Sequence, residues 1–160
     1  MNTTDNAPDV AQYLTFTLGD DVFAMDIRTV REIIQCGPMT PVPLMPAFVR
    51  GVINLRGAVV PVIDLHVRFG RPAAIANKKN CIVIFDAERD GERVALGLLV
   101  DAVSAVVDIV ADAIEPPPQF GNSLRRDFIR AMARVEQRFI VILEPAKALD
   151  FDEAAVKLAA

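Results

Sequence analysis

The sequence repeats itself at an offset of 80 residues, and this repeat restricts the possible folds more than any other feature of the chain. Residues 48–52 align with residues 128–132, and residues 55–64 align with residues 135–144, both without a gap. Two hairpins rich in Val and Ile can align by chance, but the shared Phe-x-Arg motif and the shared turn position favour a true duplication. The period is too long for a solenoid. We therefore expect two similar lobes, each a small barrel, related by a pseudo-twofold axis.

Apolar runs separated by turn residues predict that most of the chain forms antiparallel hairpins. Two hairpins are expected in the first half of the chain: strands 13–18 and 22–25 with a turn at 19–21, and strands 51–55 and 58–65 with a turn at 56–57. Two more are expected in the second half: strands 81–85 and 93–100 with a turn at 86–91, and strands 128–135 and 138–143 with a turn at 136–137. Residues 101–107 are expected to continue as an extended or bent segment. Because strands follow strands directly, a βαβ alternation is excluded, and the predicted fold class is mainly β with small barrels.

Short helices are expected at three places. Residues 27–34 place apolar side chains at helical spacing after Asp26, whose carboxylate suits a helix cap. Residues 36–38 are expected to end this helix. One helical turn is expected within 109–114, and a C-terminal helix is expected to begin at about Pro145 or later.

Three further segments are expected to lie outside regular structure. The segment 38–46 contains four prolines, so it is expected to be extended and cannot be a central strand. Residues 71–79 form a polar connection. The polar residues 1–11 are expected to be frayed or disordered.

The composition excludes several functional classes. The chain has 17 Lys and Arg against 21 Asp and Glu, with a net charge of −4 and no basic run, so nucleic acid is not an expected partner. One histidine, His66, and two distant cysteines, Cys36 and Cys81, leave no cluster with ligand spacing, so we expect no metal and no cofactor. The cysteines are expected to be small buried hydrophobic residues, in a reducing compartment. The apolar runs are too short to span a bilayer and the N-terminus lacks a signal region, which predicts a cytoplasmic protein.

The motifs of common enzyme classes are absent. The sequence contains no GxSxG, no GxxxxGK[ST] and no GxGxxG. One acidic arrangement stays open, because Asp20-Asp21 and Asp64 follow apolar strands, as in a phospho-acceptor receiver domain that binds Mg²⁺ and uses one carboxylate as nucleophile. A receiver is a parallel βα repeat, however, so the predicted hairpins argue against this alternative. Asp20 and Asp21 also suit a hairpin turn.

The most specific motif is residues 48–65, FVRGVINLRGAVVPVIDL. It resembles the signature of the CheW family of chemotaxis coupling proteins, written F-I-x-G-V-I-N-L-R-G-x-x-x-P-V-x-D-L. The segments VREI at 30–33, VDAV at 100–103 and IEPPP at 114–118 agree as well. The resemblance covers about residues 12–150.

The resemblance implies one domain of two five-stranded SH3-like barrels. The lobes are expected at about 12–70 and 80–145, exchanging edge strands, with a C-terminal helix or tail at 151–160. This chain departs from the family pattern at Ala131, where glycine is usual, and at Glu144-Pro145, where Leu-Asp usually ends the motif.

The resemblance also implies a function. CheW-like proteins have no catalytic activity and link the cytoplasmic hairpin tip of methyl-accepting chemoreceptors to the regulatory domain of the histidine kinase CheA. The expected location is therefore the cytoplasm, in receptor arrays at the inner membrane. The alternative is a kinase-binding regulatory module of a non-flagellar pathway that controls pili or biofilms.

Two sets of site residues follow from the resemblance. The receptor site is expected in the first-lobe helix, the strand and turn after it, and one second-lobe segment: Val30, Glu32, Ile33, Gly51, Asn54, Leu55, Arg56, Gly57, Val100, Asp101 and Val103. The kinase site is expected in the apolar, exposed-looking residues Thr40, Pro41, Val42, Pro43, Leu44 and Met45.

Several of these residues have an ordinary structural explanation that stays open. Arg56 offers a planar fork to a receptor carboxylate, but a turn with a solvated arginine explains it as well. Gly51 and Gly57 suit a positive φ or a close approach of the backbone. Val30 and Ile33 suit a core, and the proline-rich segment suits packing on its own barrel.

Overall fold

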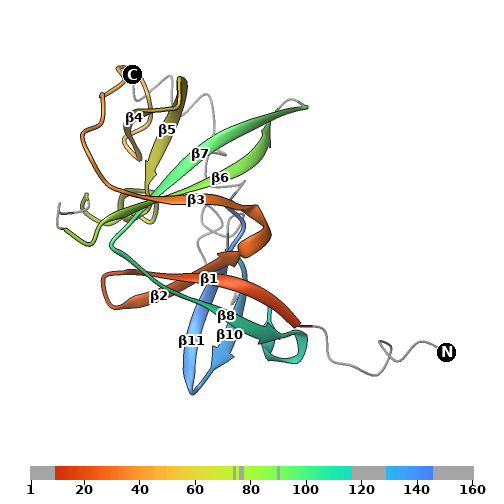
Figure 1. The fold of residues 1–160 in the computed structure, drawn as a ribbon. Coiled ribbons are helices and arrows are strands. Elements are labelled where there is room, and N and C mark those ends of the chain that lie inside the picture. Colours follow the sequence, from red (N-terminus) through yellow and green to blue (C-terminus); the bar gives the residue numbers. More distant parts are fainter. Residues whose placement is uncertain (1–9, 74, 76–77, 90, 117–128, 146–160) are drawn as a thin grey trace.

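The computed structural model describes residues 10–73, 75, 78–89, 91–116 and 129–145, and most of them are in strands (Figure 1). The strands are β1 (Val10–Leu18), β2 (Asp21–Asp26), β3 (Val30–Gln35), β4 (Val49–Leu55), β5 (Ala58–Asp64), β6 (Cys81–Arg89), β7 (Glu92–Val100), β8 (Ala102–Val110), β9 (Ile114–Glu115), β10 (Ile129–Val135) and β11 (Arg138–Leu143). The helical elements are η2 (Ile27–Thr29), α1 (Leu65–Arg68) and η3 (Ala111–Ala113). The mainly-β prediction is confirmed.

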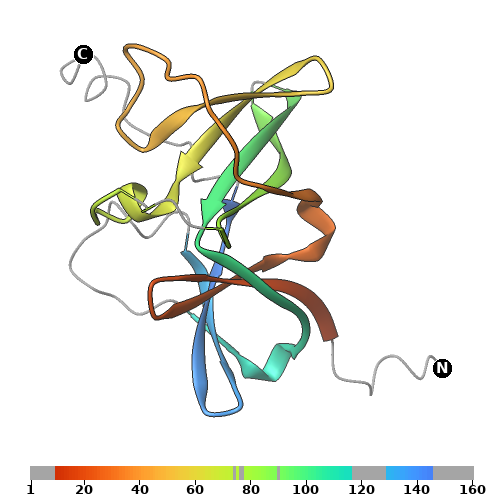
Figure 2. The ribbon, with the colours of Figure 1, turned by 60° about the vertical axis from the view of Figure 1, so that its left-hand side comes forward.

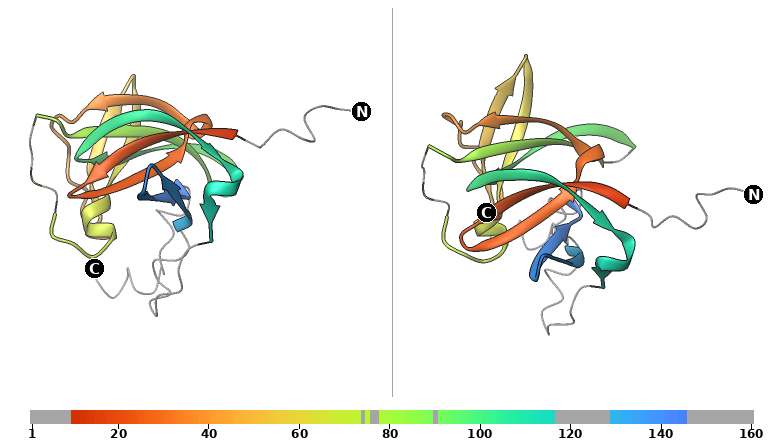
Figure 3. Two further views of the ribbon diagram at one scale, coloured as in Figure 1. Left: turned by 90° about the horizontal axis from the view of Figure 1, so that it is seen from below. Right: turned by 60° about the horizontal axis from the view of Figure 1, so that its bottom comes forward.

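The strands form two sheets, and each sheet belongs to one SH3-like barrel. The six-stranded sheet has the order β8-β1-β2-β11-β10-β9, and the five-stranded sheet has the order β3-β6-β7-β5-β4. Backbone hydrogen bonds of 3.0 and 2.8 Å between Thr40 and Val52 join the chain beyond β3 to β4 and close the second barrel. Figures 2 and 3 show the β4–β5 hairpin (yellow) and the β10–β11 hairpin (blue) on opposite sides of the other strands.

Each barrel takes strands from both halves of the sequence. The hairpin β1–β2 lies in the six-stranded sheet, but the next strand, β3, pairs with β6 of the other sheet. In the same way, the hairpin β6–β7 lies in the five-stranded sheet, while the next strand, β8, pairs with β1. The sequence ranges 12–70 and 80–145 therefore exchange whole hairpins rather than edge strands. This exchange also makes two pairs parallel, β5 with β7 and β11 with β2, within otherwise antiparallel sheets.

The strand pairing confirms the internal duplication. The β4–β5 and β10–β11 hairpins have equivalent turns, with positive φ at Arg56 and Gly57 in one and at Glu136 and Gln137 in the other. Both hairpins have a bulge at the second residue of the first strand, between Val49 and Gly51 in β4 and between Ile129 and Ala131 in β10. The strands β3 and β8, which follow the exchanged hairpins, occupy equivalent places at the edges of the two sheets.

The predicted helix over residues 27–34 is wrong. Asp26 does cap a helical turn, because its Oδ1 accepts a hydrogen bond from the Arg28 backbone N–H at 2.9 Å. That turn, η2, ends at Thr29, and the chain continues as the strand β3. Val30, Ile33 and Ile34 are β-branched and favour a strand, and half-buried side chains alternate with exposed ones along β3.

Several element boundaries also differ from the prediction. The predicted turn at 86–91 is shorter, because β6 continues to Arg89 and β7 begins at Glu92. Val10 and Ala11, predicted to be frayed, pair with β8. The short helix α1 was not predicted, whereas η3 confirms the helical turn within 109–114. The predicted C-terminal helix, the tail at 151–160, residues 1–9, Pro117-Pro118 and Phe128 lie outside the described residues.

Three apolar clusters stabilise the fold. Each barrel has its own cluster, and the largest cluster takes side chains from both sheets, including Phe16 of β1, Phe85 of β6 and Leu98 of β7. Along β6 the side chains alternate, so that Ile84 faces the cluster of the five-stranded barrel while Phe85 faces the shared cluster. The two barrels therefore share a common core, because successive side chains of a strand point to opposite faces of its sheet.

Candidate functional site

An open groove of about 590 Å³ lies where β3, the start of β6 and the start of β8 meet. Its lining includes Ile33, Ile34, Lys78, Lys79, Ala102 and Val103. The groove therefore joins two strands, β3 and β8, that come from opposite repeats of the sequence. The strands β3 and β8 supply the apolar floor of the groove, and the chain before β6 supplies two lysines.

The groove unites two predicted receptor-site residues that lie far apart in the sequence. Ile33 has 41% of its surface exposed, which is high for an isoleucine, and Val103 is half-buried. Apolar floors of this kind accept the apolar face of an amphipathic helix. The sequence-based prediction missed Ile34, Lys78 and Lys79, which also line the groove.

An ion pair links two other predicted receptor-site residues, Glu32 of β3 and Arg56 of the β4–β5 turn. The guanidinium of Arg56 donates to both carboxylate oxygens of Glu32, with N–O distances of 2.6 and 3.3 Å. This hydrogen bond raises the pKa of Arg56 above its usual value. Arg56 and Gly57 form the positive-φ turn of the hairpin, and the Asn54 side chain accepts a hydrogen bond from the Gly57 N–H at 2.9 Å. The turn residue Arg56 thus pairs with β3, while 73% of its side-chain surface stays exposed to solvent.

Gly51 is required by a close approach of two backbone segments. A Cβ atom at this position would lie 2.7 Å from the carbonyl oxygen of Thr40 and 3.2 Å from the Cβ of Met39. Real Cβ atoms do not approach a backbone oxygen so closely, and φ at Gly51 is not positive. The sequence left two explanations for these glycines. A close approach of the backbone explains Gly51, and a positive φ explains Gly57.

Three predicted receptor-site residues serve mainly to pack the fold. Val100 is 1% exposed and belongs to the shared cluster. Val30 packs against the same cluster, and Leu55 packs against the cluster of the five-stranded barrel. The ordinary core explanation therefore holds for Val30, whereas Ile33 points its side chain into the groove.

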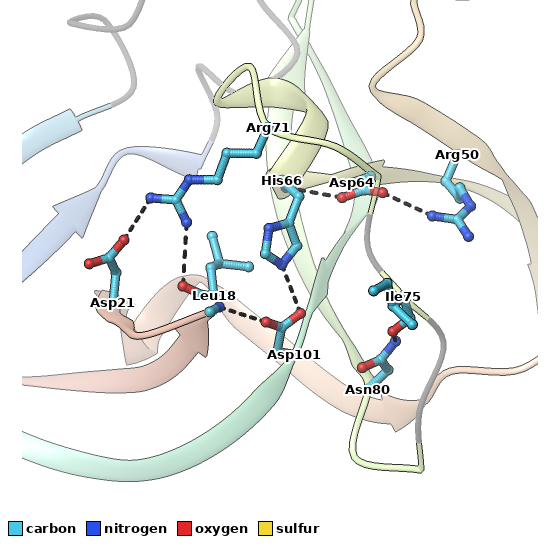
Figure 4. Close-up of polar contacts among 10 residues, drawn as sticks. Leu18, Asp21, Arg50, Asp64, His66, Arg71, Ile75, Asn80 and Asp101 are labelled. Carbon is cyan, nitrogen blue, oxygen red and sulfur yellow. Dashed lines mark hydrogen bonds and ion pairs between the residues drawn. The ribbon is translucent and has the colours of Figure 1, made fainter.

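Asp101 forms the centre of a polar clamp between the barrels (Figure 4). Its carboxylate lies 2.9 Å from Nε2 of His66 and accepts a hydrogen bond of 2.6 Å from the backbone N–H of Gly19. Arg71, which follows α1, binds the carboxylate of Asp21 at 2.6 Å on the other side of the same turn. The segment after β5 thereby holds the β1–β2 turn, next to the start of β8.

The phospho-acceptor alternative is wrong. The carboxylate of Asp64 is 0% exposed, forms an ion pair of 2.9 Å with Arg50 and accepts the His66 backbone N–H at the start of α1. Asp20 and Asp21 lie at the β1–β2 turn, as the hairpin interpretation predicted. Within the described ranges, no group of three or more His, Cys, Asp or Glu side chains could hold a metal ion.

The two cysteines lie on opposite faces of the β3–β6 pair. Cys36 packs against the cluster of the five-stranded barrel and Cys81 against the shared cluster. Both are free and half-buried rather than fully buried as predicted, and burial raises the pKa of the Cys36 thiol. Their placement fits a packing role.

The predicted kinase-site segment runs along the outside of the five-stranded barrel between β3 and β4 (Figure 2). Thr40 is anchored to Val52, but Val42, Leu44 and Met45 are all exposed, with Leu44 at 73%. The alternative in which these side chains pack on their own barrel therefore does not apply to Leu44. Pro43 and Pro41 restrict the backbone around it.

A second hollow, of about 430 Å³, lies on the six-stranded barrel. Its lining combines apolar side chains, among them Phe23, Phe69 and Phe139, with the charged side chains of Asp20, Asp21, Arg71 and Arg138. Phe139 is half exposed, and the guanidinium of Arg134 lies 4.9 Å from the centre of its ring. This hollow was not predicted from the sequence.

Comparison with known proteins identifies the family. The family model for the CheW-like domain matches residues 12–153. The chain belongs to the CheW family. The chemotaxis protein CheW of Rhizobium meliloti is 39% identical over 133 residues, which cover 83% of each chain. The CheW of Klebsiella aerogenes is 32% identical over 145 residues, covering 91% of this chain and 85% of that protein.

A solved CheW structure has the same fold. The scaffolding protein TtCheW from Thermoanaerobacter tengcongensis superposes with a TM-score of 0.80 at 30% identity, over 95% of this chain and 96% of that one. The sequence resemblance to chemotaxis proteins is thereby confirmed in three dimensions. In the part of the chain that the structure describes, no helix is long and apolar enough to cross a membrane.

Proposed function

We propose that this chain is a non-catalytic scaffold that couples the cytoplasmic tips of chemoreceptors to the histidine kinase CheA, in arrays at the cytoplasmic side of the inner membrane. The groove between β3 and β8 is the observation that carries this proposal, because it offers a helical receptor tip an apolar floor that both repeats build. Family membership supports it, and one solved relative is itself named a scaffolding protein.

The receptor side of the proposal uses the groove and the ion pair between Arg56 and Glu32. Ile33 and Val103 would contact the apolar face of a receptor helix, in the helix-in-groove mode. Arg56 already binds Glu32, so a receptor carboxylate would share or replace that partner. Since the guanidinium presents a planar fork, it can serve two carboxylates at once.

The kinase side of the proposal uses the proline-rich segment. The stretch from Thr40 to Ala47 has no charged residue, although charged residues make up 24% of the chain. Its exposed apolar side chains form a continuous run along the chain, which is typical of a surface that a partner protein covers. The groove and this segment involve different residues, so one chain could bind receptor and kinase together and gain avidity from both contacts.

The first experiment is a reconstituted kinase assay with receptor-bearing membranes, the kinase, and this protein added or omitted. We expect the added protein to raise receptor-dependent phosphorylation severalfold. Ile33→Glu, in the groove, should lower that activation at least about tenfold, because a buried carboxylate replaces an apolar contact. Val10→Glu is the matched control, since Val10 is also an exposed strand residue but lies at the far end of β8 from the groove.

Two outcomes would contradict the proposal. Kinase activity that is the same with and without this protein, in the presence of several receptors, would remove the coupling role. Equal activity of Ile33→Glu and Val10→Glu would remove the groove as the receptor site.

A further inference from the structure

The groove between β3 and β8 has a basic wall. Lys78 and Lys79, both exposed, line the groove from the chain before β6. None of the described residues that line the groove is acidic, although Asp and Glu outnumber Lys and Arg by 21 to 17 in the whole chain. The groove therefore combines an apolar floor with positive charge from a single connection, and a purely apolar ligand would leave that charge unused.

Hydrogen bonds attach this wall to the floor of the groove. The carbonyl of Asn80 accepts a hydrogen bond of 3.0 Å from the N–H of Cys36, directly after the end of β3. The side chain of Asn80, a residue that is only 3% exposed, donates from Nδ2 to the carbonyl of Ile75 at 3.1 Å (Figure 4). Because Asn80 directly follows the two lysines, their backbone is held next to β3, and little backbone freedom remains to be lost when a ligand binds.

An amphipathic helix with an acidic edge matches this arrangement. Side chains three and four positions apart lie on the same face of a helix, so a carboxylate that faces the lysines can flank the apolar residues that contact Ile33 and Val103. The carboxylate would form charge-assisted hydrogen bonds with a lysine ammonium group. A docked helix would also exclude water from this pair, which reduces its screening by salt.

A membrane surface matches the arrangement less well. Recognition of anionic lipids by charge uses clusters of about 4–8 Lys and Arg, whereas two lysines line the groove and the chain has a net charge of −4. The apolar side chains also lie at the floor of a groove, which suits a rod about 10–12 Å wide, such as a helix, better than a flat layer of headgroups.

We propose that Lys78 and Lys79 select the ligand of the groove by binding a carboxylate on the edge of a receptor helix. This inference rests on the proposed function, in which that helix belongs to a receptor tip. It defines the receptors that the chain serves as those whose tip carries Asp or Glu three or four positions from the apolar residues that enter the groove. The apolar floor offers contact area to many amphipathic helices, and the two lysines discriminate between them.

The test measures binding of the full chain to a soluble cytoplasmic fragment of a receptor by titration calorimetry. Lys78→Glu/Lys79→Glu should bind at least about tenfold more weakly than the wild type, because two attractions become repulsions. The matched control is Arg130→Glu/Arg134→Glu, which changes the net charge equally at exposed positions of β10, with three strands between β10 and β8 in the sheet order. This control should bind the fragment normally. Lys78→Gln/Lys79→Gln removes the charges without adding repulsion, and it replaces the charge reversal if urea unfolding shows that the reversal perturbs the fold.

Two further measurements separate charge from shape. Raising the ionic strength from about 0.1 M to about 1 M shortens the Debye length from about 10 Å to about 3 Å, so the affinity of the wild type should fall and that of Lys78→Gln/Lys79→Gln should change much less. The second measurement uses a panel of receptor fragments in which each acidic residue of the tip is replaced singly by lysine. One replacement should weaken binding of the wild type and strengthen binding of Lys78→Glu/Lys79→Glu. A panel in which no replacement does so would contradict direct pairing.

Three results would overturn the inference. If the wild type and both lysine variants bind the fragment equally well, the lysines do not select the ligand, while the groove and the proposed function stand. If the wild type binds none of several receptor fragments, the proposed function fails and this inference fails with it. If the wild type binds phosphatidylglycerol vesicles as tightly as the receptor fragment, and Lys78→Gln/Lys79→Gln does not bind the vesicles, the lysines bind a lipid headgroup and the helix assignment is wrong.

Discussion

Replacing Gly51 by alanine should open the five-stranded barrel at the point where it closes. The new Cβ would lie 2.7 Å from the Thr40 carbonyl oxygen and 3.1 Å from its carbon. Both are backbone atoms, so no rotamer change can relieve the contact. The segment that carries Thr40 must move away from β4, and the two hydrogen bonds of 3.0 and 2.8 Å to Val52 must lengthen or break.

The magnitude follows from these contacts. Each backbone hydrogen bond contributes about 1 kcal/mol net, and forcing a methyl group into a packed site costs about 1–3 kcal/mol. Gly51→Ala should therefore lower the free energy of unfolding by roughly 2–4 kcal/mol. For a chain of this size that corresponds to a fall in melting temperature of roughly 5–15 °C.

Urea unfolding gives the free energy, and hydrogen exchange of the Thr40 and Val52 amides locates the damage. Gly37→Ala is the matched control, because it lies in the same connection but a Cβ there meets nothing within 4 Å and φ is not positive. We expect Gly37→Ala to be neutral or slightly stabilising. A Gly51→Ala variant within about 0.5 kcal/mol of Gly37→Ala, with both amides still protected, would refute the reasoning.

Three other perturbations test the polar contacts. Arg56→Glu should keep the unfolding midpoint but lower receptor-dependent kinase activation. The double variant Glu32→Arg/Arg56→Glu restores an ion pair between the two positions, but it should not restore activation. Full restoration of activation would show that only the internal ion pair matters. Asp101→Ala should lower the free energy of unfolding by about 1–2 kcal/mol, because the clamp to the β1–β2 turn is lost, and an unchanged urea midpoint would remove that role. The Arg28 side chain lowers the pKa of Asp26, so this carboxylate stabilises the fold above its unfolded pKa of about 4 and loses that contribution at lower pH. The stability difference between wild type and Asp26→Asn should then be constant near neutrality and shrink below about pH 4, and a difference that grows on acidification would contradict this sign.

The hairpins could be predicted because their signals are local. The turn at Arg56-Gly57 stands between two apolar runs, and the structure places strands and turn as expected. The residues 27–34 were misassigned because η2 supplies a true helical start at Asp26, while pairing with β6, more than 45 positions away, decides the conformation of the rest. Tertiary pairing overrides an ambiguous local pattern of this kind.

The candidate site was predicted unevenly for a similar reason. The resemblance identified Ile33 and Val103, which the groove unites, but it gave no sign of Lys78 and Lys79. These lysines reach the groove only because the connection before β6 passes the end of β3. The positive φ of 65° at Leu44 could not be predicted either, since a proline-rich sequence predicts extension and not a left-handed residue.

The exchange of strands has a consequence for how the molecule can form. Val10 at the start of β1 pairs with Val110 at the end of β8, so neither sheet is complete until distant parts of the chain have met. Contacts of such long range slow folding, because the entropy of closing large loops is lost before the contacts stabilise the product. A gene fragment that encodes one repeat would therefore lack the hairpin that the other repeat supplies to its barrel. Two such fragments should associate, and the duplication is readily pictured as an ancient homodimer whose subunits became one continuous chain.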